Sequence, residues 1–156
     1  MISRDAVLDL MHKDIGKVRR SGDWFTVSQE LIDGFVAITG DTNWIHTDSA
    51  RASKEPNFGV TVAPGAMGIA LLPRLTGLDS AYTRYPCKYA LNQGWDRIRF
   101  LRPLRVGSRI RAVSKLVAAE LRPDGSLRVA VEFCLEVENS AEPWMIGIKI
   151  GRFFYD

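Results

Sequence analysis

The stretch "GDTNWIHTD" at residues 40–48 places Asp41 and His46 five positions apart, with Asn43 between them. An imidazole titrates near neutral pH, and a carboxylate can accept a proton or hold the ring, so the pair suits general acid–base catalysis on a water molecule. Asn43 is placed to orient either group. Asp and Asn are also common turn residues, and a single histidine is more often structural, so the residue types leave both interpretations open.

Convergence of these two side chains requires a bend in the backbone. On an unbroken helix, residues five positions apart point about 140° away from each other around the axis. Gly40 precedes Asp41 directly and is a typical helix stop. We therefore expect Asp41 and His46 to lie in a non-helical connection, where both can face one water molecule.

A second group suited to chemistry is a backbone amide in "VTVAPGAMG", residues 60–68. Pro64 and Gly65 stand just before an apolar helical segment, so the Gly65 N–H is expected to be one of its unpaired N-terminal donors. Such a donor can stabilise negative charge on a carbonyl oxygen, as in an oxyanion hole. Proline at a helix start and glycine at a packing contact are also ordinary structural choices.

The elements around the acid–base stretch are predicted from capping residues and periodicity. Residues 24–27 read as a short strand, and Ser28 is a fair N-cap for a helix with Leu31, Ile32, Phe35 and Ile38 on one side. Gly40 ends that helix. Asp48 is an N-cap candidate for a short helix over 50–52. These signals place His46 in a connection between two helices.

The second half of the chain predicts a sheet around one buried helix. Residues 65–75 are apolar nearly all round, which is typical of a helix surrounded by protein. Segments 96–101, 108–119, 127–138 and 145–154 read as strands, and "RPDGS" at 122–126 is a strong hairpin turn. The fold class predicted is α+β, with an antiparallel meander folded over the helix.

Length and composition limit the class of protein. The 156 residues are expected to form one domain, 1–156, in which the N-terminal ~20 residues are an extra helical segment. Hydrophobic residues make up 46% and charged residues 25%, the balance of a soluble globular protein. Lysine and arginine exceed the acidic residues by only three and are scattered, which does not favour a nucleic-acid partner.

The cysteines and the hydropathy of the sequence predict the cellular compartment of the protein. Cys87 and Cys134 lack metal-ligand spacing, so neither a zinc site nor a disulfide framework is indicated, and a reducing cytoplasm fits best. The N-terminus carries charges where a signal peptide needs an apolar run. The longest apolar stretch, 60–75, contains Pro64 and is shorter than the ~20 residues of a membrane span. We expect a cytoplasmic protein without a membrane segment.

The sequence also resembles a known family. "FVAITGDTNWIHTDSARA", residues 35–52, resembles the hydratase signature of the MaoC-like family, the (R)-specific enoyl-CoA hydratases: an aromatic residue, then Gly-Asp-x-Asn-x-aliphatic-His, then a small residue. The likeness extends to "FGVTVAPGAMG" and to "LNQGWDRIRFLRPLRVGSRIRA" at 91–112, and covers most of residues 20–115. "TGDTNWIHTD" is most similar to the nodulation protein N-like branch of the family. The matched positions are Gly40, Asp41, Asn43, Ile45, His46 and Ala52.

The resemblance implies a fold and an activity. The fold is the hot dog, a long helix wrapped by a curved antiparallel sheet, assembled as a homodimer or a dimer of dimers. The reaction is hydration of a trans-2-enoyl thioester to an (R)-3-hydroxyacyl thioester in fatty acid metabolism, with acyl-CoA or acyl carrier protein as carrier and no cofactor or metal. Asp41 and His46 would activate the water, the Gly65 amide would bind the thioester carbonyl, and Asn43 would support the loop.

Two positions depart from the family pattern. Trp44 replaces a common proline, and its side chain is expected to pack rather than react. Pro64 replaces a common histidine before the oxyanion glycine, which removes a hydrogen-bonding side chain and restricts the backbone. We therefore expect acyl specificity or rate to differ from typical members.

Other functions and sites stay open at this point. Hot-dog proteins also include acyl-CoA thioesterases, and a non-catalytic acyl-CoA or acyl-carrier binding module is favoured if Pro64 compromises the oxyanion site. The helix around Met67, Ile69 and Leu71 either lines an acyl tunnel or forms ordinary core. The strand residues Arg97, Arg99 and Arg109 either contact CoA phosphates or are solvated.

Overall fold

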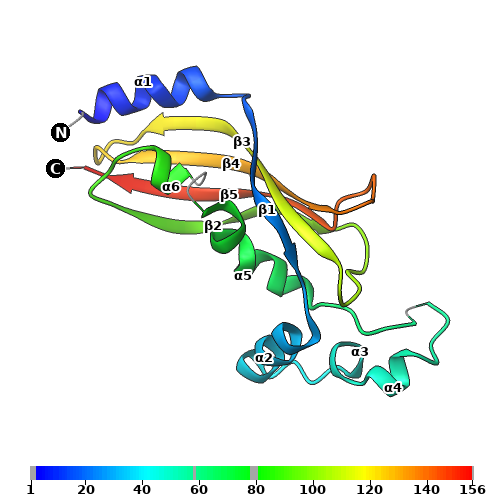
Figure 1. The fold of residues 1–156 in the computed structure, drawn as a ribbon. Helices are drawn as coiled ribbons and strands as arrows, with labels where there is room; N and C mark the ends of the chain where they lie inside the picture. The colour runs from blue at the N-terminus through cyan, green and yellow to red at the C-terminus, as the bar shows by residue number, and fades with distance from the viewer. Residues whose placement is uncertain (1–2, 58, 78–80, 156) are drawn as a thin grey trace.

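Five antiparallel strands form one sheet that curves over a single long helix, α5 (Figure 1). The computed structural model describes residues 3–57, 59–77 and 81–155. The order across the sheet is β1-β3-β4-β5-β2. This arrangement confirms the predicted α+β class and the helix-against-sheet plan of the hot-dog fold. The strands are β1 Val18–Thr26, β2 Tyr89–Phe100, β3 Arg109–Leu121, β4 Leu127–Val137 and β5 Met145–Phe154.

The predicted meander is correct for only three of the strands. β3, β4 and β5 follow one another in the sheet, but β1 pairs with β3 and β2 crosses to the far side of β5. Both flanking strands also begin earlier than residues 24 and 96, where the sequence places them. Their first residues lack an alternating pattern, and pairing with β3 or β5 holds them extended instead.

The β3–β4 hairpin follows the predicted pattern closely. Alternate residues of β4 are buried, including Leu127, Val129, Phe133 and Leu135. In the turn, Gly125 has a φ of 80°, a conformation that glycine adopts without strain. The turn therefore fixes the register in which the buried face of β4 meets α5.

Helix α5, Gly65–Thr76, confirms the predicted buried helix over most of its length. Met67, Leu72 and Leu75 point into the core, and Gly68 lies against Trp144, where an added Cβ would meet the indole ring at 3.0 Å. The expectation that protein surrounds this helix on all sides is wrong, because one face of α5 is exposed to solvent. Exposed residues on that face are Ala66, Ala70, Pro73 and Arg74.

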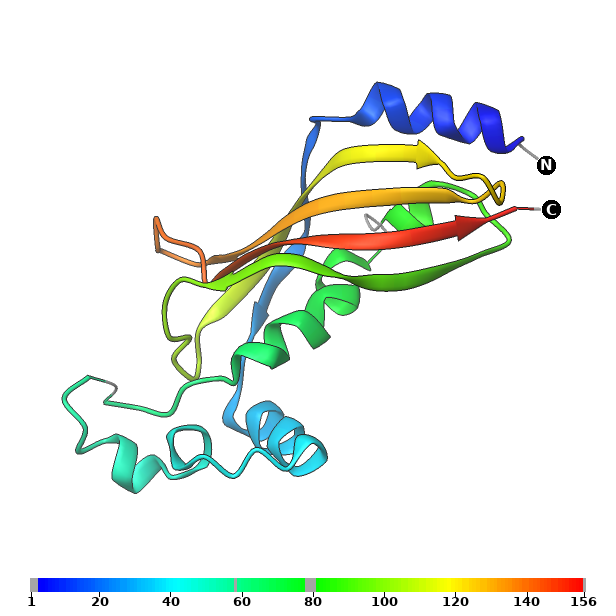
Figure 2. The same cartoon turned by 180° about the vertical axis from the view of Figure 1, so that it is seen from behind.

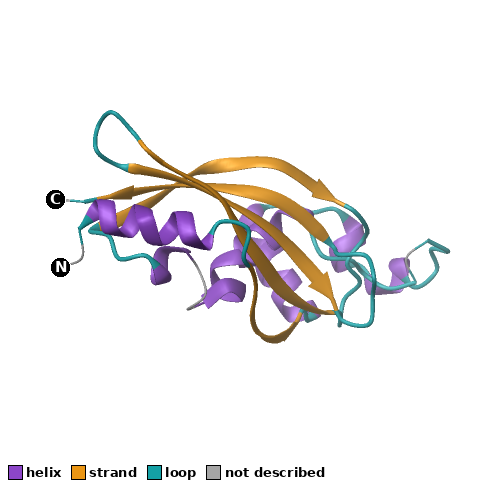
Figure 3. Ribbon diagram, turned by 90° about the horizontal axis from the view of Figure 1, so that it is seen from above, coloured by secondary structure: helices purple, strands orange, loops and turns teal. Residues whose placement is uncertain are grey.

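Helix α1, Arg4–Asp14, covers a part of β3 that β1 leaves free. The β1–β3 pairing involves β3 only up to Lys115. Beyond that point His12 Nε2 lies 3.0 Å from the Ala119 carbonyl oxygen, and α1 runs beside β3 (Figures 2 and 3). The edge of β3 is thus shielded by a strand over one half and by a helix over the other, which protects its backbone from non-native pairing.

The two cysteines, Cys87 and Cys134, are free thiols. Burial raises the pKa of both side chains above the ordinary value. Because of this higher pKa, both thiols are weakly nucleophilic at neutral pH, and neither is a candidate for chemistry.

No helix in the described part of the chain is long and apolar enough to cross a bilayer.

Candidate active site

The acid–base stretch begins at the end of helix α2, Gln29–Thr39. The Ser28 side chain accepts a hydrogen bond from the Leu31 N–H, which confirms the predicted N-cap. Gly40 adopts the left-handed conformation with a φ of 72° and ends the helix, as predicted. The chain therefore reverses immediately before Asp41.

His46 lies on a short helix of its own. The sequence places it in a non-helical connection, but residues Trp44–Thr47 form α3, and α4, Ser49–Ala52, follows. Asn43 caps α3 by accepting from the Ile45 N–H, and Asp48 caps α4 by accepting from the Arg51 N–H. The prediction of a connection was wrong here because one capped turn is too short to show periodicity.

The Asp41 and His46 side chains face each other. His46 Nε2 lies 3.6 Å from Asp41 Oδ2, and the His46 side chain is only 8% exposed whereas the Asp41 side chain is 45% exposed. His46 Nδ1 lies 2.6 Å from the Val62 carbonyl oxygen. A carbonyl only accepts, so Nδ1 carries the proton and Nε2 of the neutral ring is unprotonated. Because 3.6 Å exceeds a direct hydrogen bond, Nε2 is available to a water molecule.

An extended segment, residues 61–63, holds the histidine in this position. The Val62 N–H donates to the Ile45 carbonyl, so Val62 contacts α3 through both of its backbone polar groups. On the opposite side, the Ala63 N–H donates to the Leu104 carbonyl. Residues 61–63 therefore lie between α3 and the loop that joins β2 to β3, and they fix the imidazole through the Val62 carbonyl.

Gln29 is a positioning residue that the sequence did not reveal. Its Nε2 donates to the His46 carbonyl at 2.8 Å, and its Oε1 accepts from the Thr61 hydroxyl at 2.5 Å. Thr61 is 1% exposed, so this hydrogen bond also satisfies a buried hydroxyl. Its place beside the N-cap predicts only a residue of the first helical turn, so no sequence signal could identify these contacts.

The Gly65 amide is an open donor at the start of α5. Pro64 occupies the N-cap position and provides no side-chain hydrogen bond. Within residues 3–57, 59–77 and 81–155, no group accepts a hydrogen bond from the Gly65 N–H. An added Cβ would meet the Phe100 ring at 2.9 Å, so only glycine permits this close contact without movement of the ring. The amide is therefore free to bind a ligand oxygen.

One open cleft of about 400 Å³ joins the histidine and the glycine. Asp41 borders this cleft only through its contact with His46, and Asn43 does not line it. The Asn43 N–H donates to Asp41 Oδ1 at 3.3 Å. The imidazole of His46 and the Gly65 backbone donor thus share one solvent-accessible space, and the Asp41 carboxylate adjoins it through His46. The cleft is lined by Ile45, His46, Val62, Ala63, Gly65, Phe100, Leu101, Arg102, Pro103 and Trp144.

The Trp44 side chain packs against Arg51, which agrees with the expectation that it packs rather than reacts. The Arg51 guanidinium lies 3.9 Å from the centre of its ring.

The helix positions proposed for an acyl tunnel divide between two environments. Met67 and Leu71 border an apolar cleft of about 470 Å³ between α2 and α5, whereas Ile69 packs against the core. This cleft shares no lining residue with the His46 cleft.

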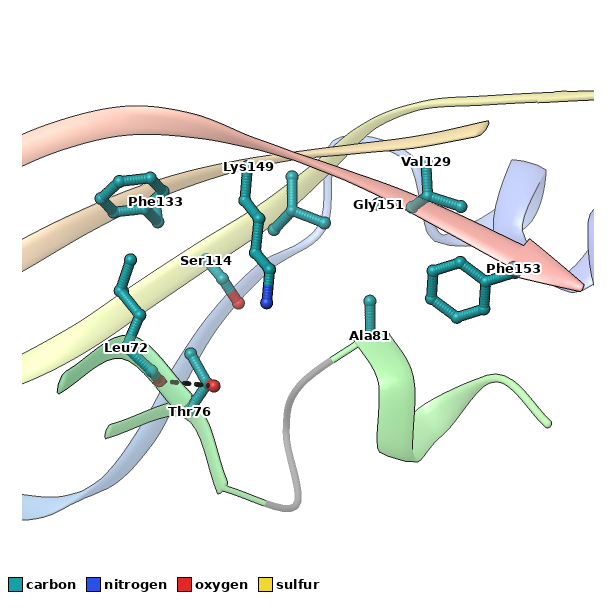
Figure 4. A pocket seen from close by; sticks show the side chains of 10 residues that line it. Leu72, Thr76, Ala81, Ser114, Val129, Phe133, Lys149, Gly151 and Phe153 are labelled. Carbon is teal, nitrogen blue, oxygen red and sulfur yellow. Dashed lines mark hydrogen bonds between the residues drawn. The ribbon is translucent and has the colours of Figure 1, made fainter. Parts of the chain in front are cut away.

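A smaller cavity lies between the C-terminal half of α5 and the sheet (Figure 4). Its volume is about 40 Å³, and Leu72, Thr76, Ser114 and Phe133 contribute to its lining. Lys149 extends from β5 toward Ser114 and Thr76, and burial lowers its pKa to about 8. The cavity shares no lining residue with the His46 cleft, so it does not belong to the same site.

Comparison with known proteins extends the resemblance over nearly the whole chain. The MaoC-like domain family matches residues 11–132. The chain is 42% identical over 149 residues to 3-hydroxyacyl-thioester dehydratase Z of Mycobacterium tuberculosis, covering 96% of each. It is 34% identical over 142 residues to nodulation protein N of Rhizobium leguminosarum bv. viciae, and the alignment covers 91% of this chain and 88% of that protein.

A solved structure shows the same fold. The (R)-hydratase from A. caviae involved in PHA biosynthesis aligns with a TM-score of 0.69 at 20% identity, covering 91% of this chain and 96% of that one. Together with the sequence relatives, this likeness confirms the family resemblance predicted from residues 35–52 and the hot-dog fold.

Proposed function

Because this chain belongs to the MaoC-like domain family, we propose that it is an (R)-specific enoyl-thioester hydratase or, in the reverse direction, a 3-hydroxyacyl-thioester dehydratase. It is thus a hydro-lyase. The observation that carries the proposal is the position of His46 Nε2, 3.6 Å from Asp41 Oδ2 and in the same cleft as the open Gly65 amide, with Nδ1 occupied by the Val62 carbonyl.

The proposed mechanism uses these three groups on a conjugated thioester. Conjugation makes C3 electrophilic, and His46 Nε2 accepts a proton from water as the water oxygen bonds to C3. The electron pair of the double bond moves to the thioester oxygen, where the Gly65 N–H stabilises the enolate. Asp41 stabilises the imidazolium that forms. The enolate collapses as C2 takes up a proton from solvent, and the imidazolium releases its proton to solvent, which gives the 3-hydroxyacyl thioester and restores neutral His46.

Each of these steps draws on groups of this chain, the thioester and water, and we propose that no cofactor or metal ion is required. The pantetheine carrier is either CoA or an acyl carrier protein. His46 acts as the base rather than as an acid in the hydration direction, because Val62 holds its proton on Nδ1.

We also propose a homodimer in which two sheets meet at β2. This strand has a neighbour, β5, on one side only, and its outward residues Tyr89 and Leu91 are 49% and 52% exposed. An apolar edge strand of this kind favours pairing with a second copy. Sedimentation of the Leu91→Lys variant tests the idea: a monomer is expected, and an unchanged dimer would place the contact elsewhere.

The function is tested with crotonyl-CoA as substrate. Loss of the conjugated double bond measures hydration, chiral analysis of the product checks the (R) configuration, and release of free thiol measures hydrolysis. We expect (R)-3-hydroxybutyryl-CoA and no thiol. Thiol release without hydration would instead indicate a thioesterase. Binding that stabilises the fold without turnover would indicate a non-catalytic module.

A further inference from the structure

Two arginines stand at the mouth of the His46 cleft, in the loop between β2 and β3. Arg102 and Arg105 line a neighbouring hollow of about 430 Å³ together with Asn57 and Glu142. The hollow and the His46 cleft share three lining residues, Val62, Arg102 and Pro103. A ligand bound at Gly65 can therefore continue into this hollow without crossing the core.

Neither arginine is neutralised by a nearby carboxylate. Within residues 3–57, 59–77 and 81–155, no acidic oxygen lies within 4.0 Å of the Arg102 or Arg105 guanidinium. Arg102 is half-buried, and its Nη1 donates to the uncharged Ser140 hydroxyl at 2.5 Å. Arg109, by contrast, pairs with Glu138 at 2.8 Å. The loop thus presents two positive charges, one of them held in a fixed position.

The position of Arg105 is set by the same segment that holds the catalytic histidine. Arg105 and Val62 form a β-bridge, and the Val106 N–H donates to the Thr61 carbonyl. Val62 precedes Gly65 by three residues and lies across a bridge of about 5 Å from Arg105, which places the Arg105 backbone within about 15 Å of the oxyanion donor. The arginine side chain reaches outward from there, toward solvent.

We propose that Arg102 and Arg105 form the binding site for the phosphate of the substrate's pantetheine carrier. The inference rests on the proposed function, because an enoyl thioester carried by CoA or by an acyl carrier protein has its anionic groups on the distal end of the pantetheine arm. A guanidinium presents paired N–H donors that match phosphate oxygens and keeps its charge at all relevant pH values. The half-buried Arg102 and the exposed Arg105 together clamp such a group.

Glu142 limits the affinity of this site. Its carboxylate lines the same hollow and repels a bound phosphate, although it lies beyond ion-pair distance of either arginine. Removal of its charge by Glu142→Gln is therefore expected to tighten phosphate binding severalfold, whereas a change to either arginine weakens it. The opposite signs of the two effects are specific to an electrostatic site.

Binding of the free carrier tests the proposal without turnover. Calorimetric titration with CoA is compared with titration with pantetheine, which lacks phosphate. Arg105→Gln and Arg102→Gln are each expected to weaken CoA binding about tenfold and to leave pantetheine binding unchanged. The matched control is Arg109→Gln, on the adjacent strand and already paired with Glu138, which is expected to bind CoA as the wild type does.

Kinetics then distinguish the two carriers. With crotonyl thioesters of CoA, 4′-phosphopantetheine and pantetheine, the arginine variants are expected to raise KM about tenfold for the phosphorylated substrates while kcat is unchanged. An effect on the first two substrates assigns the arginines to the phosphate that CoA shares with acyl carrier protein. An effect on crotonyl-CoA alone assigns them to the outer phosphates of CoA.

Two results would overturn the inference: equal effects of Arg105→Gln on all three thioesters, or unchanged CoA binding in both arginine variants. Failure of the wild type to hydrate any thioester is a different outcome. It would refute the proposed function, while the CoA titration would still report on the arginine site. Weakening of CoA binding by added salt in the wild type, but less so in Arg105→Gln, supports the charge-based recognition.

Discussion

The Asp41→Asn variant tests the acid–base pair most directly, because asparagine keeps the shape of the side chain and removes only its charge. In the proposed mechanism Asp41 stabilises the imidazolium at 3.6 Å. At that distance, Coulomb's law gives about 2–5 kcal/mol for effective dielectric constants of about 40 to 20. The Asp41 side chain is 45% exposed, so solvent screening favours the lower end of this range.

A loss of about 2–3 kcal/mol corresponds to a decrease in kcat of roughly a hundredfold. The assay is hydration of crotonyl-CoA under saturating substrate, with circular dichroism to establish that the variant is folded. His46→Ala removes the base itself and is expected to lower the rate at least as much. Asp48→Asn is the matched control, because asparagine still caps α4 and the residue lies outside the cleft.

The expected rate loss depends on charge and so responds to ionic strength. Added salt screens the exposed Asp41 carboxylate, so the gap between the wild type and Asp41→Asn narrows as salt rises. A folded Asp41→Asn protein that turns over within threefold of the wild type would refute the role of this carboxylate. A large loss in Asp48→Asn would show that the assay reports on loop stability instead.

Three further perturbations follow from contacts in the fold. Gln29→Leu leaves the Thr61 hydroxyl buried without its partner and releases the His46 carbonyl, so kcat is expected to fall about tenfold and urea unfolding to show a loss of about 1–3 kcal/mol. Gly147→Ala places a Cβ 2.7 Å from the buried Phe133 ring, which is expected to cost about 1–3 kcal/mol by the same measurement, whereas no change would mean that the ring can move. Hydrogen bonds from Lys17 and Tyr85 hold the pKa of Asp14 at about 2, below its ordinary 3.8, so its stabilising contribution is present above pH 3.8 and is lost as the pH falls through about 2. Asp14→Asn is therefore expected to be less stable than the wild type by about 1 kcal/mol at pH 7, given the exposure of Lys17, with the difference vanishing near pH 2 in thermal unfolding.

Local signals in the sequence were sufficient for the elements that flank the site. Ser28 and Gly40 bound α2 through capping chemistry that involves only neighbouring residues, and α5 follows from a continuous apolar run. Asp41 and His46 were predicted because their residue types suit acid–base work and because residues 35–52 resemble the MaoC-like signature. All of these features depend on residues close together in the chain, which is the range that periodicity and capping describe.

The remaining features depend on contacts between distant segments. The proton position on His46 is set by the Val62 carbonyl, and Gln29 acts through residues 46 and 61. Charge pairing is equally invisible in sequence. Arg109 was a candidate for phosphate contact, yet it is paired with Glu138. No short-range pattern encodes which arginines lie beside carboxylates after folding.

Residues 61–65 carry consequences for how such enzymes diversify. The carbonyl that fixes the imidazole and the amide that we propose binds the thioester oxygen both come from this one stretch of backbone. Their mutual alignment depends on the backbone dihedrals of this stretch, which hydrogen bonds to Leu104 and Val106 of the loop between β2 and β3 hold in place. Substitution of the Arg102 and Arg105 side chains can therefore alter the proposed carrier site without removing these backbone contacts, whereas an insertion or deletion in the same loop would move the proposed reactive centre as well.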